Sequence, residues 1–396
     1  MCKLENQYGN SYSQENCMKN RYTVFSILIA FSLLSLLALN SCAKKETTIR
    51  IGVVGPMTGD QSKMGLDVKN GTELAVKEWN RKGGVLGKKI ELLVEDDQHD
   101  PKQAVAVANK LVNAGAAGII GHFNSSASIP ASAVYNRSKI PMITPASTNP
   151  QLTEQGFEYV FRVCGRDDQQ GLVAAIFVSD VLKLKKVAVI HDKTTYGQGL
   201  ADEFKKALGD KVAVVYYSGV IQGDKDFRSV LTAIKGKKPE LLYFGGIYPE
   251  GGLLIKQARE LGINIPFMSG DGVIDQKFIE IAGPASEGSY LTFSPDPANI
   301  PSAKDFLNSY KSIYGEAGPY SIYAYDAANI MLQAIADTQS TDGEKISKTI
   351  HNMKHSGALG ELQWDVKGDV LRSPYIVWVT KNGKFEEYWK PSEAAQ

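Results

Sequence analysis

Two stretches of small hydroxyl-bearing residues stand where the chain turns from an apolar run into a helix-like segment. They read GHFNSSASIPAS at residues 121–132 and MITPASTNP at residues 142–150. Their side chains, together with the free N–H groups at a helix start, can donate hydrogen bonds to an anion. Ser125 is expected to cap the first helix. The stretches therefore predict a site for the carboxylate of a small ligand, although the hydroxyls could also serve only as helix caps.

Other polar clusters could do chemistry, and each has a simpler interpretation. The run EDDQHD at residues 95–100 looks superficially like a metal site, but a solvated loop that ends in a helix cap explains it better. His191 and Asp192 suggest a catalytic dyad, yet no serine motif of the form G-x-S-x-G accompanies them. GGVLGK at residues 83–88 is neither a P-loop nor a dinucleotide fingerprint. We therefore expect no enzyme activity, no metal and no cofactor.

The 396-residue chain has ordinary globular composition and nearly balanced charge. It is 43% apolar and 22% charged, with 44 Lys and Arg against 43 Asp and Glu. Such a balance offers no basic surface for nucleic acid, and the length favours two domains. Of the four cysteines, Cys2, Cys17 and Cys42 lie in or beside an N-terminal leader, so Cys164 is left without a partner. No disulfide framework is expected.

The N-terminal region has the pattern of an export signal. Residues 22–42 form an apolar run of about the length of a secretory signal core, and Lys19 and Arg21 flank it. Its end, LNSC, resembles a bacterial lipobox, in which cleavage precedes a cysteine that then carries lipid. A retained transmembrane anchor is the alternative. We expect a signal region at residues 1–41 with translation starting at Met18, lipid attachment at Cys42, and a lipidated tether at residues 42–47.

The elements that must position the candidate site alternate between apolar strands and amphipathic helices. Such alternation predicts an α/β fold with parallel sheets. Asp100, Pro101 and Gln103 suit the N-cap, the first helical position and a capping box. Ligands bind at the carboxyl ends of strands in open parallel sheets, which is where the Ser and Thr clusters fall. The expected helices include 63–81, 101–113, 168–182, 197–208, 227–234, 251–261, 323–338 and 344–353.

The C-terminal region changes to paired strands. LGELQWDVKGD at residues 359–369 and SPYIVWVTKNGKFEEYW at residues 373–389 read as paired β-like runs. KNGK at residues 381–384 predicts a tight hairpin.

A series of motifs follows in order from about residue 48 to 370. The series includes VVGPMTGD, EDDQHDPKQAVAVANKLV, GHFNSSASIPAS, PMITPASTNPQLT, FRVCGRDDQQG, VAVIHDKTTYGQGLA, YFGGIYPEGG, FMSGDG, YAYDA and LQWDVKGD. In this order and spacing the chain resembles the type I periplasmic binding proteins, specifically the leucine/isoleucine/valine-binding protein family that serves ABC transporters.

The resemblance implies a fold of two Rossmann-like α/β lobes with parallel sheets, joined by crossing strands that act as a hinge. The ligand would lie in the cleft between the lobes, and closure would be a hinge motion. Lobe one would comprise residues 48–166 plus 295–374, and lobe two residues 167–294 plus 375–396.

The resemblance also implies which residues contact the ligand. On the first lobe, Ser125 and Thr148 would donate to a carboxylate, with Ser147 between Thr148 and Ala146, whose carbonyl would accept from an ammonium group. On the second lobe, Asp271 would be the charge partner of the ammonium, at a position where a branched-chain binder of the family has Glu. Tyr196 would cover the ligand from that lobe.

The side-chain end of the expected site is apolar. The family often has a Tyr at the positions of Met64 and Ile247 in this chain. The phenol missing at Ile247 could instead come from the adjacent Tyr248. Met64, Phe123 and Ile247 would favour an aliphatic or aromatic amino acid over a charged one. Among apolar ligands that differ by a few methylenes, such a pocket discriminates by only about 1–3 kcal/mol.

The expected function is that of an exported, lipid-anchored solute-binding protein. It would act as a monomer, capture a branched-chain or other apolar amino acid, and deliver it to the permease of an ABC transporter. The alternative is a ligand-sensing receptor module for an amide or amino acid that takes no part in transport.

Overall fold

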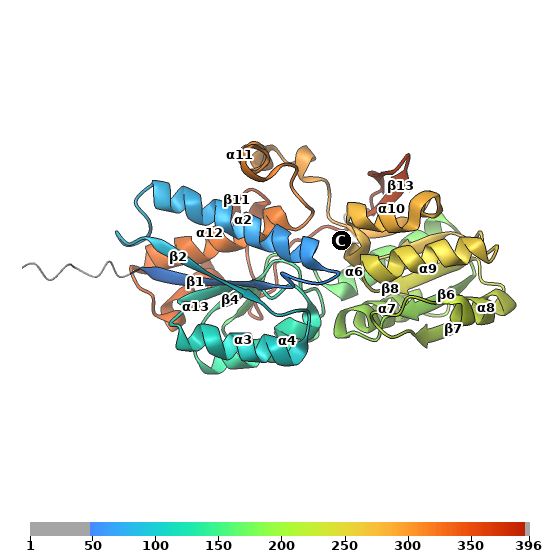
Figure 1. Ribbon diagram of the computed structural model, residues 1–396, viewed down its shortest axis with the longest axis horizontal. Helices are drawn as coiled ribbons and strands as arrows, with labels where there is room; N and C mark the ends of the chain where they lie inside the picture. The colour runs from blue at the N-terminus through green and yellow to red at the C-terminus, as the bar shows by residue number, and fades with distance from the viewer. Residues whose placement is uncertain (1–47, 393–396) are drawn as a thin grey trace, which may run out of the picture. The chain divides into compact units, whose positions relative to one another are not determined.

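The computed structural model describes residues 48–392 (Figure 1). The expected signal region, the start at Met18, the lipid site Cys42 and the tether lie outside these residues. None of the helices within residues 48–392 combines the length and the hydropathy that crossing a bilayer would need.

The first lobe is built on a five-stranded sheet in which every strand is parallel to its neighbours. Its central strands are short and wholly buried because helices cover both faces. In sheet order the strands are β2 (Ile90–Asp96), β1 (Ile49–Gly55), β3 (Gly118–Ile120), β4 (Met142–Thr144) and β5 (Val160–Arg162).

Helices pack on both faces of this sheet (Figure 1). On one face lie α2 (Ser62–Arg81) and α12 (Ser321–Thr338), and on the other α3 (Pro101–Asn113) and α4 (Ser125–Arg137). Gly71 allows α2 and α12 to approach closely, since a Cβ there would lie 2.1 Å from the Ser321 carbonyl oxygen. The remaining elements of the lobe are α5 (Gln151–Glu154), α11 (Lys304–Tyr314), α13 (Gly343–Asn352), β11 (His355–Gly357) and β12 (Gly360–Leu362).

The second lobe is built on a seven-stranded mixed sheet. Five strands are parallel, and two antiparallel strands extend the sheet at one edge. In sheet order they are β14 (Lys384–Trp389), β13 (Ile376–Lys381), β10 (Tyr290–Phe293), β9 (Phe267–Ser269), β8 (Leu241–Gly245), β6 (Lys186–His191) and β7 (Ala213–Gly219).

Two apolar clusters cover the faces of the second sheet. One contains α6 (Asp167–Ile176) and α7 (Thr195–Leu208), and the other α8 (Arg228–Lys237), α9 (Tyr248–Glu260) and α10 (Gln276–Ala282). A π-helical turn, η1 (Phe177–Val181), continues α6. Short 3₁₀ turns complete the structure: η2 (Asp271–Val273), η3 (Gly283–Ser286), η4 (Pro297–Asn299) and η5 (Pro301–Ala303).

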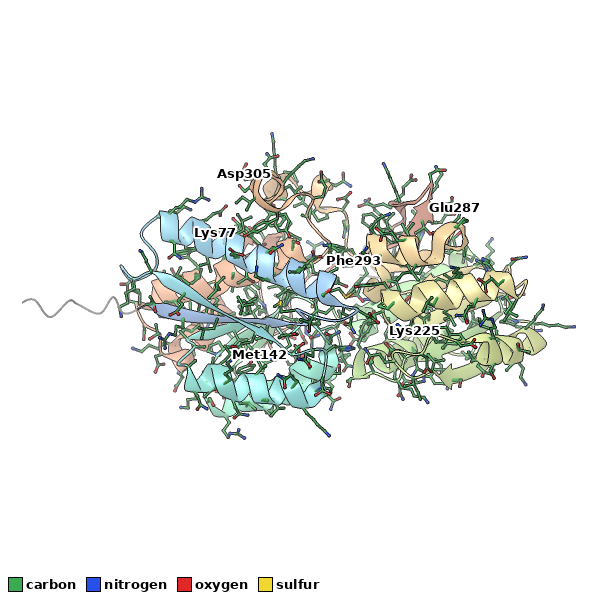
Figure 2. The ribbon with its side chains drawn as sticks, viewed as in Figure 1. Lys77, Met142, Lys225, Glu287, Phe293 and Asp305 are labelled. Atoms are coloured by element: carbon green, nitrogen blue, oxygen red, sulfur yellow. The ribbon has the colours of Figure 1, made fainter. Side chains whose placement is uncertain are left out.

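The chain passes between the two sheets three times: after β5, after β10 and before β13. Phe293, labelled in Figure 2, stands at the end of β10 where the second passage begins. The structure thus confirms the predicted α/β fold with two lobes, whereas the residue bounds given to each lobe stay a prediction.

The predicted helices are present, and two local predictions need correction. Asp100 caps α3 by accepting from the backbone N–H groups of Lys102 and Gln103 at 2.8 Å each, and the hairpin at residues 381–384 joins β13 to β14. The helix expected over 168–182 changes to π geometry after Ile176. The two C-terminal runs do not pair with each other, because β12 pairs with β11 in a separate two-stranded sheet while β13 joins the second lobe.

Candidate functional site

A small cavity lies where the carboxyl ends of strands from the two sheets meet. Its volume is about 20 Å³, which is room for roughly one water molecule. The residues that line it come from the loops after β3, β4, β8 and β9, from α7, and from the residue before α12. They are Phe123, Asn124, Ser125, Ala146, Tyr196, Ile247, Asp271, Gly272 and Tyr320.

The first wall of this cavity begins at the N-terminus of α4. The prediction that Ser125 caps this helix is wrong, because Asn124 occupies the N-cap and Ser125 is the first helical residue. The buried Ser125 hydroxyl instead accepts a hydrogen bond from the backbone N–H of Asn149 at 3.3 Å. The helix start, with its unpaired N–H groups, nevertheless faces the cavity through Asn124 and Ser125.

Hydroxyl groups bond the two Ser and Thr loops to each other. Thr144 donates to the His122 carbonyl at 2.7 Å and accepts from the backbone N–H of Ser147 at 2.9 Å. The Ser147 hydroxyl donates to the Phe123 carbonyl at 2.9 Å and lies 2.6 Å from the Ser128 hydroxyl. Ser147 therefore serves the loops rather than the cavity.

A buried arginine holds the second of these loops from behind. Arg162 at the end of β5 is fully buried and donates to the carbonyls of Ser147 at 2.7 Å and Asn149 at 3.1 Å. Its charge is paired with Asp369 at 2.6 Å. The loop between β4 and α5 is thus fixed by a guanidinium whose own charge is compensated.

The second wall is built around the carboxylate of Asp271, at the start of η2. One carboxylate oxygen accepts from the Tyr196 hydroxyl at 2.8 Å and from the Gln170 side-chain amide at 3.0 Å. The Tyr320 hydroxyl, from the first lobe, donates to the Asp271 carbonyl at 2.9 Å. Gly270 is needed beside this network, because a Cβ there would lie 2.1 Å from the Gln170 side-chain oxygen.

Burial determines the ionisation of this wall. It raises the pKa of Asp271, and the hydrogen bonds from Gln170 and Tyr196 only partly oppose this effect. Burial also raises the pKa of Tyr196 and Tyr320 well above the usual range, so both phenols stay protonated and can donate. A cation at the cavity would stabilise the Asp271 carboxylate.

The structure brings six of the ten predicted contact residues to the cavity and places four elsewhere. Ser147 faces the loops, and Thr148 is buried behind them with its backbone carbonyl bonded to the N–H of Asp167. Met64 belongs to α2 and is buried in the apolar core. Tyr248 donates to the Asp60 carbonyl at 2.5 Å and lines a different surface pocket. The six at the cavity are Phe123, Ser125, Ala146, Tyr196, Ile247 and Asp271.

Sequence reasoning missed three residues that line the cavity: Asn124, Gly272 and Tyr320. Tyr320 packs edge-on against Phe123, with ring centroids 4.7 Å apart, and so adds an aromatic side to the apolar end. The only signal for Tyr320 in the sequence was its position close to the YAYDA motif. The motif's own tyrosines, Tyr323 and Tyr325, were equally plausible candidates for the cavity. Tyr323 packs in the core and Tyr325 donates to Glu78 at 2.6 Å.

Several contacts hold the two lobes together around the cavity. Lys225, labelled in Figure 2, forms an ion pair with Asp60 at 3.0 Å across the cleft. The Asn149 side-chain amide donates to the Thr195 carbonyl at 2.8 Å, and Gln222 bonds to His99. The lobes therefore stand in a closed arrangement.

The polar clusters that could have been a metal site or a catalytic dyad have structural roles. Asp97 and His122 are buried and bonded at 2.8 Å, and Asp100 caps α3. His191 accepts from the backbone N–H of Lys193, and Asp192 accepts from Thr194 rather than from histidine. Within residues 48–392 no three His, Cys, Asp or Glu side chains are arranged to hold a metal ion.

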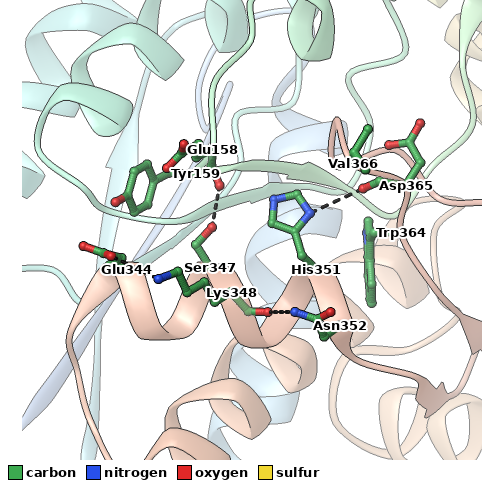
Figure 3. Close-up of a pocket in the computed structure, with 10 residues that line it drawn as sticks. All are labelled: Glu158, Tyr159, Glu344, Ser347, Lys348, His351, Asn352, Trp364, Asp365 and Val366. Carbon is green, nitrogen blue, oxygen red and sulfur yellow. Dashed lines mark hydrogen bonds and ion pairs between the residues drawn. The ribbon is translucent and has the colours of Figure 1, made fainter.

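Larger pockets lie outside this cavity, and one of about 290 Å³ opens at the mouth of the cleft beside Asp60, Lys225 and Tyr248. One of about 380 Å³ opens beside α13 on the first lobe, where the His351 ring lies 3.3 Å from the Asp365 carbonyl and the Ser347 hydroxyl donates to the Glu158 carbonyl (Figure 3). None of the predicted contact residues lines it. Size alone therefore does not select the functional site in this protein.

Comparisons with known proteins agree with this fold. The family model described as "Periplasmic binding protein" matches residues 48–384. Leu/Ile/Val-binding protein homolog 1 of Brucella suis is 40% identical over 373 residues, which cover 93% of this chain and 98% of that protein. An amino acid binding protein of Pseudomonas aeruginosa is 41% identical over 367 residues, with 91% and 97% covered.

Solved structures give the same result. The leucine binding protein LivK of Thermotoga maritima is 33% identical with a TM-score of 0.82, and the match covers 87% of this chain and 99% of that one. LivJ of Streptococcus pneumoniae, solved in complex with isoleucine, is 28% identical with a TM-score of 0.81 and coverage of 87% and 100%. The resemblance seen in the sequence is confirmed. The chain belongs to the periplasmic binding protein family, has the type I fold, and is a member of the Leu/Ile/Val-binding group.

Proposed function

We propose that this protein captures an α-amino acid with a branched or otherwise apolar side chain in the cleft and delivers it to an ABC permease. The observation that carries the proposal is the opposition of the two walls: hydroxyl and N–H donors at Ser125 face the buried carboxylate of Asp271. A zwitterion needs this combination. Related proteins support the ligand class, among them a leucine-, isoleucine-, valine-, threonine- and alanine-binding protein of Pseudomonas aeruginosa, 36% identical over 354 residues.

Each end of the ligand has a matching group. The carboxylate would accept from the Ser125 hydroxyl and from the N–H groups at the start of α4, a site that favours negative charge. The ammonium would donate to the Ala146 carbonyl and to Asp271, which Tyr196 and Gln170 hold in place. Charge-assisted hydrogen bonds of this kind contribute roughly 1.5–3 kcal/mol each.

The side chain of the ligand would contact apolar residues. Phe123, Ile247 and the ring of Tyr320 line the cavity and are almost fully buried. The groups that would hold the carboxylate and the ammonium lie elsewhere on the lining, so a charged ligand side chain would lack a partner at this end. This arrangement favours aliphatic amino acids.

Binding would require the lobes to separate and close again. A cavity of about 20 Å³ cannot hold leucine, whereas pockets for small ligands commonly measure about 300 Å³ or more. A hinge motion at the three connecting segments would open the cleft and then bury the ligand. No bond is made or broken in this cycle.

The cellular setting forms part of the proposal. Cleavage before Cys42 and lipid attachment to it would anchor a monomer on the outer side of a bacterial membrane, where it meets the permease. Mass spectrometry of the N-terminal peptide tests this directly. A diacylated Cys42 is expected, and an unmodified peptide that begins upstream of Cys42 would contradict it.

A thermal-shift screen against the twenty amino acids tests the ligand. Leucine, isoleucine or valine at a hundred times its dissociation constant should stabilise the folded protein by about 2.7 kcal/mol, which raises the melting temperature by a few degrees. Failure of every amino acid to shift the melting temperature, with a shift by an unrelated solute, would overturn the proposed ligand class.

A further inference from the structure

One hydrogen-bond acceptor on a residue of the cavity wall has no partner. Asn124 lines the cavity and is only 6% exposed, and its side-chain oxygen Oδ1 is buried without a hydrogen bond from any residue in the range 48–392. Asn124 occupies the N-cap of α4, yet its side chain makes no bond to the start of the helix. A buried amide oxygen without a donor is costly and calls for an explanation.

The neighbours of Asn124 determine which end of its amide is free. Its side-chain nitrogen donates to the Gln61 side-chain oxygen at 2.9 Å, and Gln61 in turn directs its amide nitrogen to Nδ1 of His99. Burial lowers the pKa of His99 to about 4, so near pH 7 the ring is neutral and can accept that bond. Because Gln61 engages the nitrogen of Asn124, the free end is the oxygen, which can only accept a hydrogen bond.

Asn124 stands between two residues with different roles toward the ligand. Phe123 lines the apolar end of the cavity, whereas Ser125 would hold the carboxylate, and all three consecutive residues line it. In an α-amino acid the β-carbon is attached to the same carbon as the carboxylate. Asn124 therefore lies beside the place that the first atoms of the ligand's side chain would take.

The ammonium group of the ligand has other acceptors in the cavity. Ala146 and Asp271 both line it, and Asp271 also supplies negative charge. The side chains of leucine, isoleucine and valine carry no hydrogen-bond donor, so they would leave the oxygen of Asn124 unpaired. A hydroxyl on the β-carbon would pair with it.

We propose that Asn124 is a specificity-determining residue that accepts a hydrogen bond from a hydroxyl on the ligand's β-carbon, so that the protein binds threonine as well as aliphatic amino acids. The inference rests on the proposed function, because it assigns Asn124 to the side chain of the amino acid held in the cleft. Threonine and valine have nearly the same shape, and a purely apolar wall would favour valine by about a hundredfold. The acceptor at Asn124 offsets that preference.

Isothermal titration of the full chain with L-valine and L-threonine at pH 7 tests this. The wild type should bind threonine within about tenfold of valine. Asn124→Leu keeps the approximate size of the side chain but removes the acceptor, so the ratio of the threonine to the valine dissociation constant should rise at least about tenfold. A residue with only a structural role would change both affinities alike and leave this ratio as it is.

Asn136→Leu is the matched control, because it makes the same substitution on α4 at a residue that does not line the cavity. The Asn136 side chain accepts from the backbone N–H of Glu158 at 3.1 Å, and its loss should leave the ratio of the wild type unchanged.

Two results would overturn the inference and leave the proposed function standing. One is a wild type that favours valine over threonine by more than about tenfold. The other is a ratio that rises by less than about tenfold in Asn124→Leu. If the wild type binds none of leucine, valine and threonine, the proposed function falls as well. Should Asn124→Leu fail to fold or to bind either ligand, Asn124→Ala repeats the comparison with the same expected rise.

Discussion

The two walls of the cleft are built on opposite principles. On the first lobe the polar groups behind the surface bond to one another: Thr144, Ser147 and Arg162 leave the loops with few unmet hydrogen bonds. On the second, the buried carboxylate of Asp271 accepts from a hydroxyl and an amide, and no cation in the described part of the chain pairs with it. The first wall is a rigid frame, whereas the second holds negative charge that a ligand can compensate.

This difference separates stability from affinity. Changes behind the first wall should act on the folding free energy, because they break interactions that exist without a ligand. Changes in the second wall should act on the dissociation constant, since their buried charge is compensated only in the complex. Substitutions at four positions, in order of decreasing expected effect, test this division.

The largest effect is expected at Arg162. Arg162→Met removes one of the two guanidinium partners of Asp369, while Arg166 stays paired with it at 2.6 Å. It also leaves two buried loop carbonyls without their charged donor, which should cost about 2–6 kcal/mol of folding free energy. Urea denaturation followed by circular dichroism measures this. The double variant Arg162→Met with Asp369→Leu should recover part of the loss, and a single variant as stable as the wild type would contradict the rigid frame.

The next largest effect concerns Asp271. Asp271→Asn keeps the shape of the side chain and its bonds to Tyr196 but removes the charge. Leucine affinity should fall by about 2–5 kcal/mol, or on the order of 30-fold or more, with little loss of stability. Calorimetric titration with leucine compares Asp271→Asn with the control Glu280→Gln, in which an exposed acid loses its charge. Undiminished affinity in Asp271→Asn would place the ammonium elsewhere.

A smaller effect is expected from the Ser125 hydroxyl. Ser125→Ala removes one donor to the ligand's carboxylate and one acceptor for the Asn149 N–H, while the N–H groups of α4 remain. Affinity should fall by about 1.5–3 kcal/mol, which is roughly 10- to 150-fold. Ser126→Ala, one residue along the same helix and away from the cavity, should bind as the wild type does. Equal affinity in both variants would remove Ser125 from the carboxylate site.

The smallest effect should come from the ion pair across the mouth of the cleft. Lys225 and Asp60 are both largely exposed, so their pair contributes only about 0–1 kcal/mol. Lys225→Ala should weaken leucine binding by less than about fivefold and lower its sensitivity to salt, as titrations at low and high ionic strength would show. A larger loss would mean that closure depends on this contact rather than on the buried wall.

The fold and the position of the candidate cavity could be predicted from the sequence, but the direction in which individual side chains point could not. Alternating strands and helices fix the sheet, and parallel strands place the Ser and Thr loops at one edge. Which hydroxyl faces the cavity depends on distant partners: Ser147 turns to the Phe123 carbonyl, whereas Ser125 does not.

The same limit applies to neighbours in one motif. In GRDDQQ, Asp167 is completely buried while Asp168 is partly exposed and pairs with Arg166, and no local pattern distinguishes the two. Tyr320 reaches the cavity from the N-cap of α12, far along the chain from Ser125, so only the packing of α12 on the first lobe brings it there.

A crystal structure of the full chain with leucine tests the central account most directly. We predict that the ligand's ammonium lies within hydrogen-bond distance of Asp271 and that its carboxylate accepts from the Ser125 hydroxyl and the start of α4. Leucine seated outside the cleft, or bound in the cleft with its two ends exchanged between these walls, would contradict the account.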